Sequence, residues 1–450
     1  MNVEQATAEP IPVSSKDAAR VWLKIGLLSF GGPAGQIALM HRVLVEEKRW
    51  IGEARFLHAL NYCMLLPGPE AQQLATFVGW MLHGTRGGIV AGTLFILPGA
   101  LVMLALSAGY ALFGTVPLVA AAFVGIKAAV LAIVVDAVIR IARRALGTKA
   151  KLSLAGAAFA AIFFLAIPFP LVVLAAALAG VALHRISPGA LAGGGHGHGP
   201  GDAGSETAAT PRSTGWRHAA RVTAVCLPLW ATPVLLAGLV FGWGHVFVVE
   251  SLFFSKMAVV TFGGAYAVLS YVAQQAVEIY GWLAPGEMLN GLGLAETTPG
   301  PLILVAQFVG FLAAFRDSAP LDPLLAGIVG AGLTLWVTFV PCFYWIFLGA
   351  PYIDALRSNR ALSAALSAVT AAVVGVVLNL TVWFALHVCF ATVTEAQHGP
   401  IRLWTPDIGT VEFIPIVLAA FAMIAVLRFR VGVVPVLAGC AGLGMAAASL

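Results

Sequence analysis

Charged side chains are scarce in this chain: Asp, Glu, Lys and Arg make up 10% of 450 residues, whereas hydrophobic residues make up 60%. So few charges exclude an ordinary soluble fold, because most of the chain must face lipid or other apolar segments. Only helices and closed barrels satisfy every backbone polar group inside a bilayer, and the long Ala, Leu and Val runs lack the alternation of barrel strands. The sequence therefore predicts an all-α polytopic membrane protein.

Cysteine is also scarce, and the five cysteines are scattered singly without a CxxC pair. This spacing excludes a disulfide framework and a cysteine metal site. The HExxH, GxSxG and GxxxxGK motifs are absent as well, which argues against an enzyme, and we expect no metal and no cofactor. Residues 1–16 are polar and lack an apolar h-region, so we expect no cleaved signal peptide.

What the chain does contain is an internal repeat. A Phe-Gly-Gly triplet at residues 30–32 and a Pro-Gly-Pro triplet at 67–69 return at 262–264 and 299–301, each 232 positions later. Glycine and proline at matching places in two apolar halves mark the broken helices of a transport site. The repeat therefore points to a transporter.

The repeat divides the chain into four regions. We expect a polar N-terminal tail at residues 1–16, a first repeat at 17–185, a Gly-, Pro- and His-rich cytoplasmic linker at 186–221, and a second repeat at 222–450 that begins with a linker helix. The composition of the linker is typical of a solvated connection.

Basic loops predict the orientation of the two repeats. The connector at residues 41–55 carries four Lys and Arg residues, whereas the matching connector at 273–287 has none. The basic cluster after residue 140 likewise has no counterpart at 383–394. By the positive-inside rule, the copies face opposite sides. We therefore predict inverted-topology repeats, with the N-terminus in the cytoplasm and the C-terminus in the periplasm.

All basic loops lie on the cytoplasmic side only if residues 17–47 and 56–84 each enter and leave the membrane on the same side, as broken, re-entrant helical hairpins. The remaining apolar segments are expected to be full spans, although several are shorter than the roughly 20 residues that a bilayer usually needs. The expected spans are residues 86–112, 118–140, 152–167, 170–184, 226–247, 321–348, 361–387, 411–427 and 431–449.

The chemistry is expected at the breaks. A helix that begins inside the membrane has unpartnered N–H groups and a positive dipole end, which together stabilise an anion. Proline fits the first helical position, and glycine lets an anion approach the backbone. Close packing and kinks are the structural alternative for any single Gly-Pro. The predicted substrate-binding residues are Lys24, Phe30, Gly31, Gly32, Pro33, Gln36, Pro67, Gly68, Pro69, Gln72, Lys256, Phe262, Gly263, Gly264, Thr298, Pro299, Gly300 and Pro301.

Charged residues inside the apolar stretches are further candidates. Lys24 and Lys256 each precede a Phe-Gly-Gly triplet by six residues and either contact the substrate or extend to the membrane surface. Lys127 is expected to pair with Asp136 in the same span.

The carboxylates differ between the halves. Glu70 follows the first Pro-Gly-Pro triplet and Glu296 precedes the second. Both are candidates for proton coupling, because a desolvated carboxylate exchanges protons near neutral pH, while helix capping is the simpler role for Glu70.

The motifs FGGPAGQIALM at residues 30–40 and LPGPEAQQLA at 66–75, with their FGG and TPGP versions in the second half, resemble the chromate ion transporter family. The type is the long-chain one, with two homologous domains, and the resemblance covers almost everything except the tail and the linker. It implies a bacterial inner-membrane secondary transporter that exports chromate, as a chromate/proton antiporter, and confers chromate resistance. Ala265 stands where a third glycine is expected, so the second copy departs from the family pattern at this position.

Two functional alternatives stay open at this point. Sulfate has nearly the same shape and charge as chromate, so a sulfate or other oxyanion carrier is the first. Potential-driven uniport is the second, because a negative-inside potential already favours anion exit. The expected partners are chromate or sulfate, protons and the lipid bilayer, with no nucleic acid, and the oligomeric state is open, a homodimer included.

Overall fold

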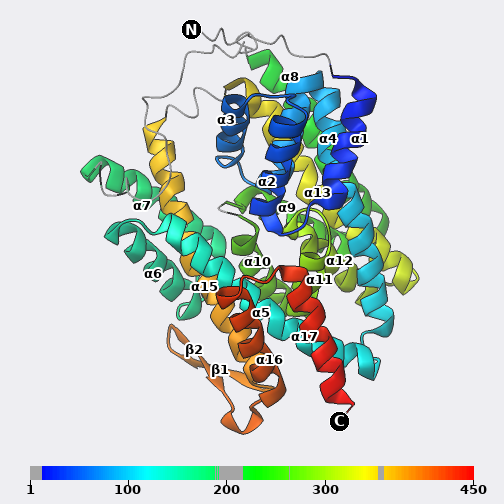
Figure 1. The fold of residues 1–450 in the computed structure, drawn as a ribbon, viewed down its shortest axis with the longest axis vertical. Coiled ribbons are helices and arrows are strands. Elements are labelled where there is room, and N and C mark those ends of the chain that lie inside the picture. The colour runs from blue at the N-terminus through cyan, green and yellow to red at the C-terminus, as the bar shows by residue number, and fades with distance from the viewer. Residues whose placement is uncertain are drawn as a thin grey trace, which may run out of the picture.

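The computed structural model describes residues 13–187, 189, 191, 216–262, 264–352 and 359–449. This part of the chain is almost entirely helical, and six of its helices are long and apolar enough to cross a membrane (Figure 1). The prediction of an all-α polytopic membrane protein is confirmed. The six helices are α4 (Glu70–Phe113), α5 (Pro117–Ala145), α7 (Phe169–Ile186), α8 (Trp216–Phe241), α13 (Pro323–Gly349) and α15 (Arg360–Cys389).

Both repeats begin with short helices that are interrupted at the predicted places. With 10 to 15 residues each, these helices reach about 15 to 22 Å, which is too short for a hydrocarbon core of about 30 Å. In the first repeat they are α1 (Ser15–Leu28), α2 (Gly32–His41) with the π-helical turn η1 (Arg42–Glu47), and α3 (Glu53–Cys63). In the second they are α9 (Val246–Val260), α10 (Ala265–Gln274) with η2 (Gln275–Ile279), α11 (Glu287–Thr297), and η3 (Leu302–Leu304) with α12 (Val305–Arg316).

Helix α4 reverses direction within its length. Its backbone is non-helical at His83 and Gly84, and a methyl group on Gly79 would lie 2.5 Å from the side chain of Ala91. Residues 70–82 therefore pack against the following segment, and only the part after Gly84 has the length of the predicted span at 86–112. This reversal agrees with the expectation that residues 56–84 do not cross the membrane as one span.

The remaining helices follow the predicted spans with shifted ends. They are α6 (Lys149–Phe163), α16 (Phe413–Met423) with η6 (Ile424–Arg428), and α17 (Val433–Ala448). All three are shorter than a usual span, and α8 begins ten residues before the predicted start at 226. The linker prediction concerns residues that mostly lie outside the described ranges.

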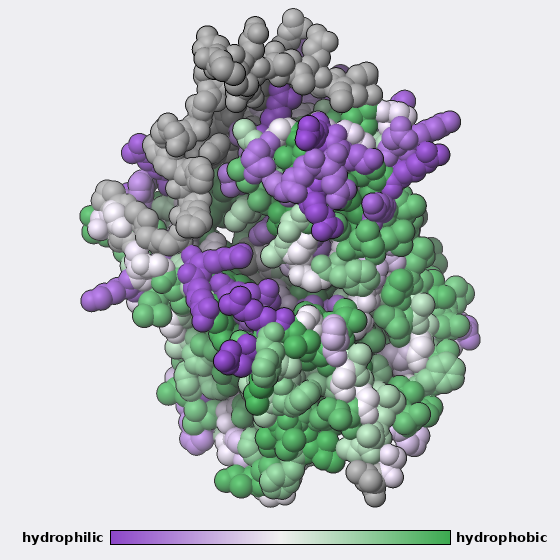
Figure 2. Space-filling model, viewed as in Figure 1, coloured by the Kyte–Doolittle hydropathy of each residue, from purple (hydrophilic) through white to green (hydrophobic). Residues whose placement is uncertain are grey.

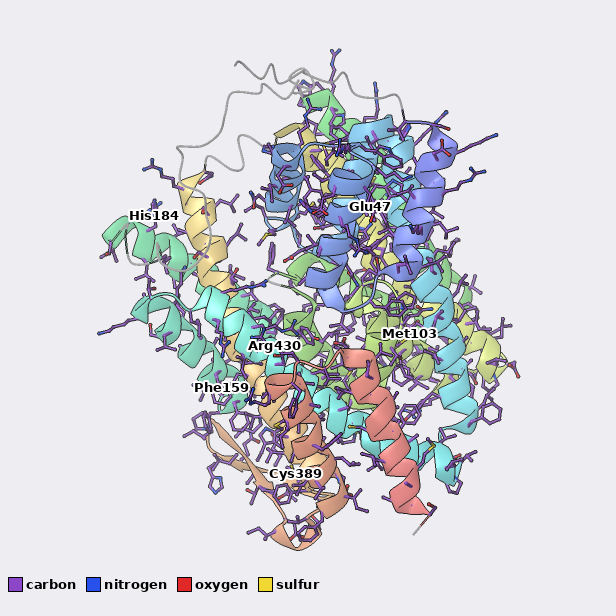
Figure 3. All side chains as sticks on the ribbon, in the orientation of Figure 1. Glu47, Met103, Phe159, His184, Cys389 and Arg430 are labelled. Atoms are coloured by element: carbon purple, nitrogen blue, oxygen red, sulfur yellow. The ribbon has the colours of Figure 1, made fainter. Side chains whose placement is uncertain are left out.

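A β-hairpin interrupts the second repeat where the sequence analysis expected no element. Strands β1 (Val393–His398) and β2 (Ile401–Pro406) pair antiparallel at the lower end of the molecule in Figure 1. The buried guanidinium of Arg402 fixes this hairpin, because it contacts the carboxylate of Glu278 on η2 at 3.1 Å and the carbonyl of Ile162 at 3.1 Å. Figure 3 shows Glu47 of η1 and Cys389 near the hairpin toward opposite ends of the fold.

The core consists of one large cluster that both halves share and a smaller one around the first hairpins. Met103 and Val130 pack in the large cluster with Phe308 and Phe384 of the second half. In the smaller cluster, α1, α3 and α4 pack with residues at the end of α13. The surface over the lower and right-hand parts of Figure 2 is mostly hydrophobic, as a lipid-facing surface requires.

We expect Gly125→Ala to destabilise the fold. Helix α5 packs against α17 so closely that a methyl group on Gly125 would lie 1.8 Å from the carbonyl oxygen of Cys440. Overpacking of this kind costs about 1–3 kcal/mol, so the thermal unfolding midpoint in detergent should fall by several degrees. Gly109→Ala in α4 is the matched control, because nothing lies within 4 Å of that position. An equal midpoint for both variants would contradict the close packing of α5 on α17.

Candidate functional site

The four breaks meet in two crossed pairs. The backbone N–H of Gly300 donates to the carbonyl of Ser29 at 2.8 Å, and the N–H of Gly68 donates to the carbonyl of Thr261 at 2.9 Å. Ser29 and Thr261 occupy equivalent places in the two repeats, as do Gly68 and Gly300. The same contact is therefore made twice with the halves exchanged, as in an isologous interface.

The backbone conformation at Gly68 and Gly300 explains why both donors are glycine. Their φ angles are 122° and 100°, in the region that residues with a side chain rarely adopt. A larger residue would strain the turn that brings each N–H to the opposite repeat.

Each Pro-Gly-Pro break packs against a span helix of the opposite half. A methyl group on Gly99 of α4 would lie 1.9 Å from the carbonyl oxygen of Pro299. The counterpart of Gly99 in the second half is Cys342 of α13, and its sulfur would lie 2.9 Å from a methyl group on Gly68. The breaks are thus enclosed by protein, as non-helical backbone at membrane depth must be.

A narrow pocket, too tight in this structure to hold a water molecule, lies beside the contact of Ser29 with Gly300. It brings backbone of the first repeat together with the end of α11 in the second, and its lining residues are Gly31, Gly32, Ala295, Glu296, Thr298, Gly300 and Leu302. The side-chain amide of Gln36 donates to the carbonyl of Gly300 at 2.5 Å. Gly31 and Gly32 have nothing within 4 Å of their Cβ positions, so the start of α2 presents open backbone.

Glu296 gives this pocket an acidic wall. Its side chain is 5% exposed, and its carboxylate accepts a hydrogen bond of 2.5 Å from the hydroxyl of Tyr266. Arg140 of α5 lies close enough to act on Glu296 and pairs with Asp136 at 2.8 Å. The sequence analysis named Glu296 but missed Tyr266 and Arg140, since nothing in the sequence showed that α5 approaches α11.

The other predicted carboxylate, Glu70, lies at the second crossed pair. It is the first residue of α4, and Pro69 occupies the cap position before it, one place earlier than expected. Gln72 follows within this helix and donates to the hydroxyl of Thr76 at 2.9 Å. The carbonyl of Pro67 accepts from the side chain of Gln73 at 2.7 Å.

The two lysines at equivalent positions of the repeats, Lys24 and Lys256, do not line the pocket. Lys24 lies on an exposed face of α1, between Leu23 and Leu27, which are exposed as well. Lys256 is exposed on α9 and lies 5.9 Å from the ring centre of Tyr271. Both positions fit the alternative in which the side chains extend along the surface of the protein.

The remaining predicted residues of the Phe-Gly-Gly copies occupy the α1–α2 and α9–α10 breaks. Phe30 is 40% exposed, and Pro33 lies in the first turn of α2. Phe262 is half-buried and Gly264 precedes α10, whereas Gly263 lies outside the described residues. Pro301 occupies the cap position before η3.

The predicted pair of Lys127 with Asp136 is not formed. The two residues are nine positions apart on α5, which separates them by about 13 Å along the axis. Asp136 pairs with Arg140 one turn away. The amine of Lys127 lies against Gly286, where Glu287 and Glu412 are close enough to stabilise its charge.

Comparison with known proteins adds the family. The family model described as chromate transporter matches residues 16–181 and 251–445, which correspond to the two repeats. A chromate transport protein of Pseudomonas aeruginosa is 34% identical over 385 residues, which cover 83% of this chain and 82% of the relative. A probable chromate transport protein of Synechococcus elongatus is 27% identical over 82% of this chain and 84% of its own length.

A chromate transport protein of Cupriavidus metallidurans is 27% identical over 81% of each chain. No solved structure matches this chain. The matched regions contain all four breaks and both crossed contacts. The chain therefore belongs to the chromate transporter family.

Proposed function

We propose that this chain exports chromate across the bacterial inner membrane, with the pocket between the two repeats as its substrate site, and thereby confers chromate resistance. The observation that carries the proposal is the pocket itself, where open backbone of Gly31 and Gly32 meets the α11–η3 break of the other half. The names of three relatives support chromate as the substrate. The predicted inverted topology supplies the two faces for alternating access.

The pocket suits a tetrahedral dianion that must be released again. Backbone N–H groups at the start of α2 are directional donors, and the dipole of the helix adds positive potential. No arginine is among the residues that line the pocket. Binding is therefore weaker than in a clamp of several guanidinium groups, which favours turnover.

The membrane potential suffices as the driving force for export. A negative-inside potential of 100 mV favours exit by roughly 2.3 kcal/mol per charge, or about 4.6 kcal/mol for a dianion. This free energy corresponds to roughly a thousandfold concentration ratio.

The protonation state of Glu296 affects chromate binding. An ionised carboxylate in the pocket wall repels a dianion, so chromate binds best when Glu296 is protonated. Glu296 thus favours binding of the anion and the proton in the same state. The chromate/proton antiport that the resemblance implies needs, in addition, a proton site outside the pocket.

Proteoliposomes with separately imposed gradients test the proposal. We expect chromate to move when a potential alone is imposed, because the substrate carries two negative charges. Vesicles without protein are the control, and sulfate in excess measures selectivity. Absence of chromate flux under either gradient would refute the proposal, flux under a pH gradient alone would establish proton coupling, and equal competition by sulfate would identify a general oxyanion carrier.

Alanine at the crossed donors should slow transport. Gly68→Ala and Gly300→Ala each place a side chain at a positive φ angle, which costs roughly 1–3 kcal/mol, and push the N–H away from its acceptor. We expect the chromate flux to fall about tenfold or more in each variant, since roughly 1.4 kcal/mol corresponds to a factor of ten. Gly399→Ala in the β-hairpin is the matched control, because its φ is also positive, at 62°, and it lies outside the site. Equal losses in all three variants would contradict a role for the crossed contact.

Glu296→Gln should remove pH dependence from anion binding. In the native protein we expect the KM for the oxyanion to rise with pH, because the ionised carboxylate repels the substrate. The glutamine variant should keep a low KM at alkaline pH, roughly tenfold below the native value. The KM is measured by counterflow over a pH series, with sulfate as the oxyanion if the protein transports it and with chromate if it does not. Glu395→Gln on the exposed hairpin is the control. A pH-dependent KM that persists in Glu296→Gln would exclude this role.

A further inference from the structure

A second carboxyl group is buried far from the pocket. Glu250 of α9 is 0% exposed, and neither of its carboxyl oxygens has a hydrogen-bond partner among the described residues. An isolated carboxylate in such surroundings costs several kcal/mol, so the group is protonated in the state that the structure represents.

The carboxyl group lies in a seam where α9, α12 and α13 meet at small residues. A methyl group on Gly330 of α13 would lie 2.9 Å from an oxygen of Glu250 and 2.8 Å from the carbonyl oxygen of Gly310 of α12. The hydroxyl of Thr334 is also buried without a partner and lies against Gly310. Close contact of the three helices keeps water away from these polar groups. Separation of the helices would let water hydrate them.

Among the residues that the structure describes, no charged group compensates Glu250 in this seam. The titratable residues on the elements that pack against α9, within the described ranges, interact elsewhere or lie at exposed ends. His245 contacts the carbonyl of Ala319, and Arg316 binds Glu287. Asp322 caps α13, Asp317 is exposed, and Lys256 lies over Tyr271. On α8, His218 contacts the carbonyl of Phe347, and Arg217 and Arg221 lie in the first two turns, far along the chain from the end of α8 that precedes α9.

Glu250 lies close to one end of the bundle. It is five residues after His245, or about 7 Å along the helix, and the contact of His245 with Ala319 places the loop between α12 and α13 at the same end. The predicted topology assigns this end to the periplasm. The equivalent residue in the first repeat is Ala18, so the other repeat has no matching carboxyl.

The opposite end of α9 reaches the crossed contact. Helix α9 ends at Val260, and the carbonyl of the next residue, Thr261, accepts the hydrogen bond from Gly68. The eleven positions between Glu250 and Thr261 correspond to about 16 Å of helix. A displacement of α9 at the seam is thus transmitted to the break by a rigid element.

We propose that Glu250 is a proton-binding site, separate from the anion pocket, that couples periplasmic pH to the closure of α9 against α12 and α13. When the seam opens, the carboxyl O–H transfers its proton to periplasmic water, and the carboxylate is then hydrated. Rebinding of a proton from the periplasm neutralises the group and lets the seam close. This inference rests on the proposed transport function, because it makes the return to the inward-facing state depend on a proton.

Inside-out membrane vesicles test the proton site, because their lumen corresponds to the periplasm. We expect chromate uptake by the native protein to fall by up to tenfold per unit rise in lumenal pH, as for a single required proton. Glu250→Gln mimics the protonated form and should transport at the fast rate at every lumenal pH. Glu395→Gln is the control and should keep the native pH dependence. A native dependence on lumenal pH in Glu250→Gln would overturn the proposal.

Infrared spectroscopy of the purified protein gives a readout that does not need transport. The carbonyl stretch of a protonated carboxyl group at neutral pH should be present in the native protein and reduced in Glu250→Gln. An identical band in both proteins would overturn the proposal even if the variant is inactive. Loss of this band in the variant, together with no chromate flux in the native protein, would refute the transport function and leave the proton site standing.

Discussion

The crossed backbone contact of the two repeats is the constraint on which the rest of the structure depends. Four helices end inside the protein, and their terminal N–H and C=O groups must find partners there because lipid offers none. The structure satisfies two donors with carbonyls of the opposite half, at Gly68 with Thr261 and at Gly300 with Ser29. Gly99 and Cys342 then pack against the same breaks from the span helices of the opposite halves.

The pocket is asymmetric, although the crossed backbone contacts are the same in both copies. The backbone bonds use glycine and the carbonyls of small residues in both copies, whereas the side chains around them differ. Gln36 and Glu296 belong to the pair of breaks at Gly300, and their repeat equivalents, Val268 and Met64, are apolar. Glu250 adds a further difference outside the pocket. The ionisable and amide side chains around the breaks are thus residues that the repeat does not share.

The sequence predicted the features that depend on local composition. Apolar length identified the helices, six of which are long enough to cross a membrane, and glycine and proline in repeat register identified all four breaks. It could not predict which break meets which, because that depends on how the halves pack. The approach of Tyr266 and Arg140 to Glu296 is such a tertiary result, and so is the partner of Asp136, which is Arg140 rather than Lys127. The β-hairpin was missed because residues 393–406 lie between the expected spans at 361–387 and 411–427, where no element was expected.

The crossed pattern of the two hydrogen bonds also constrains movement of one half against the other. The two hydrogen bonds exchange donor and acceptor between the halves, so a movement of one repeat against the other acts on both bonds at once. Because the bond between Gly300 and Ser29 lies beside the pocket, a displacement between the two halves also changes the walls of the pocket.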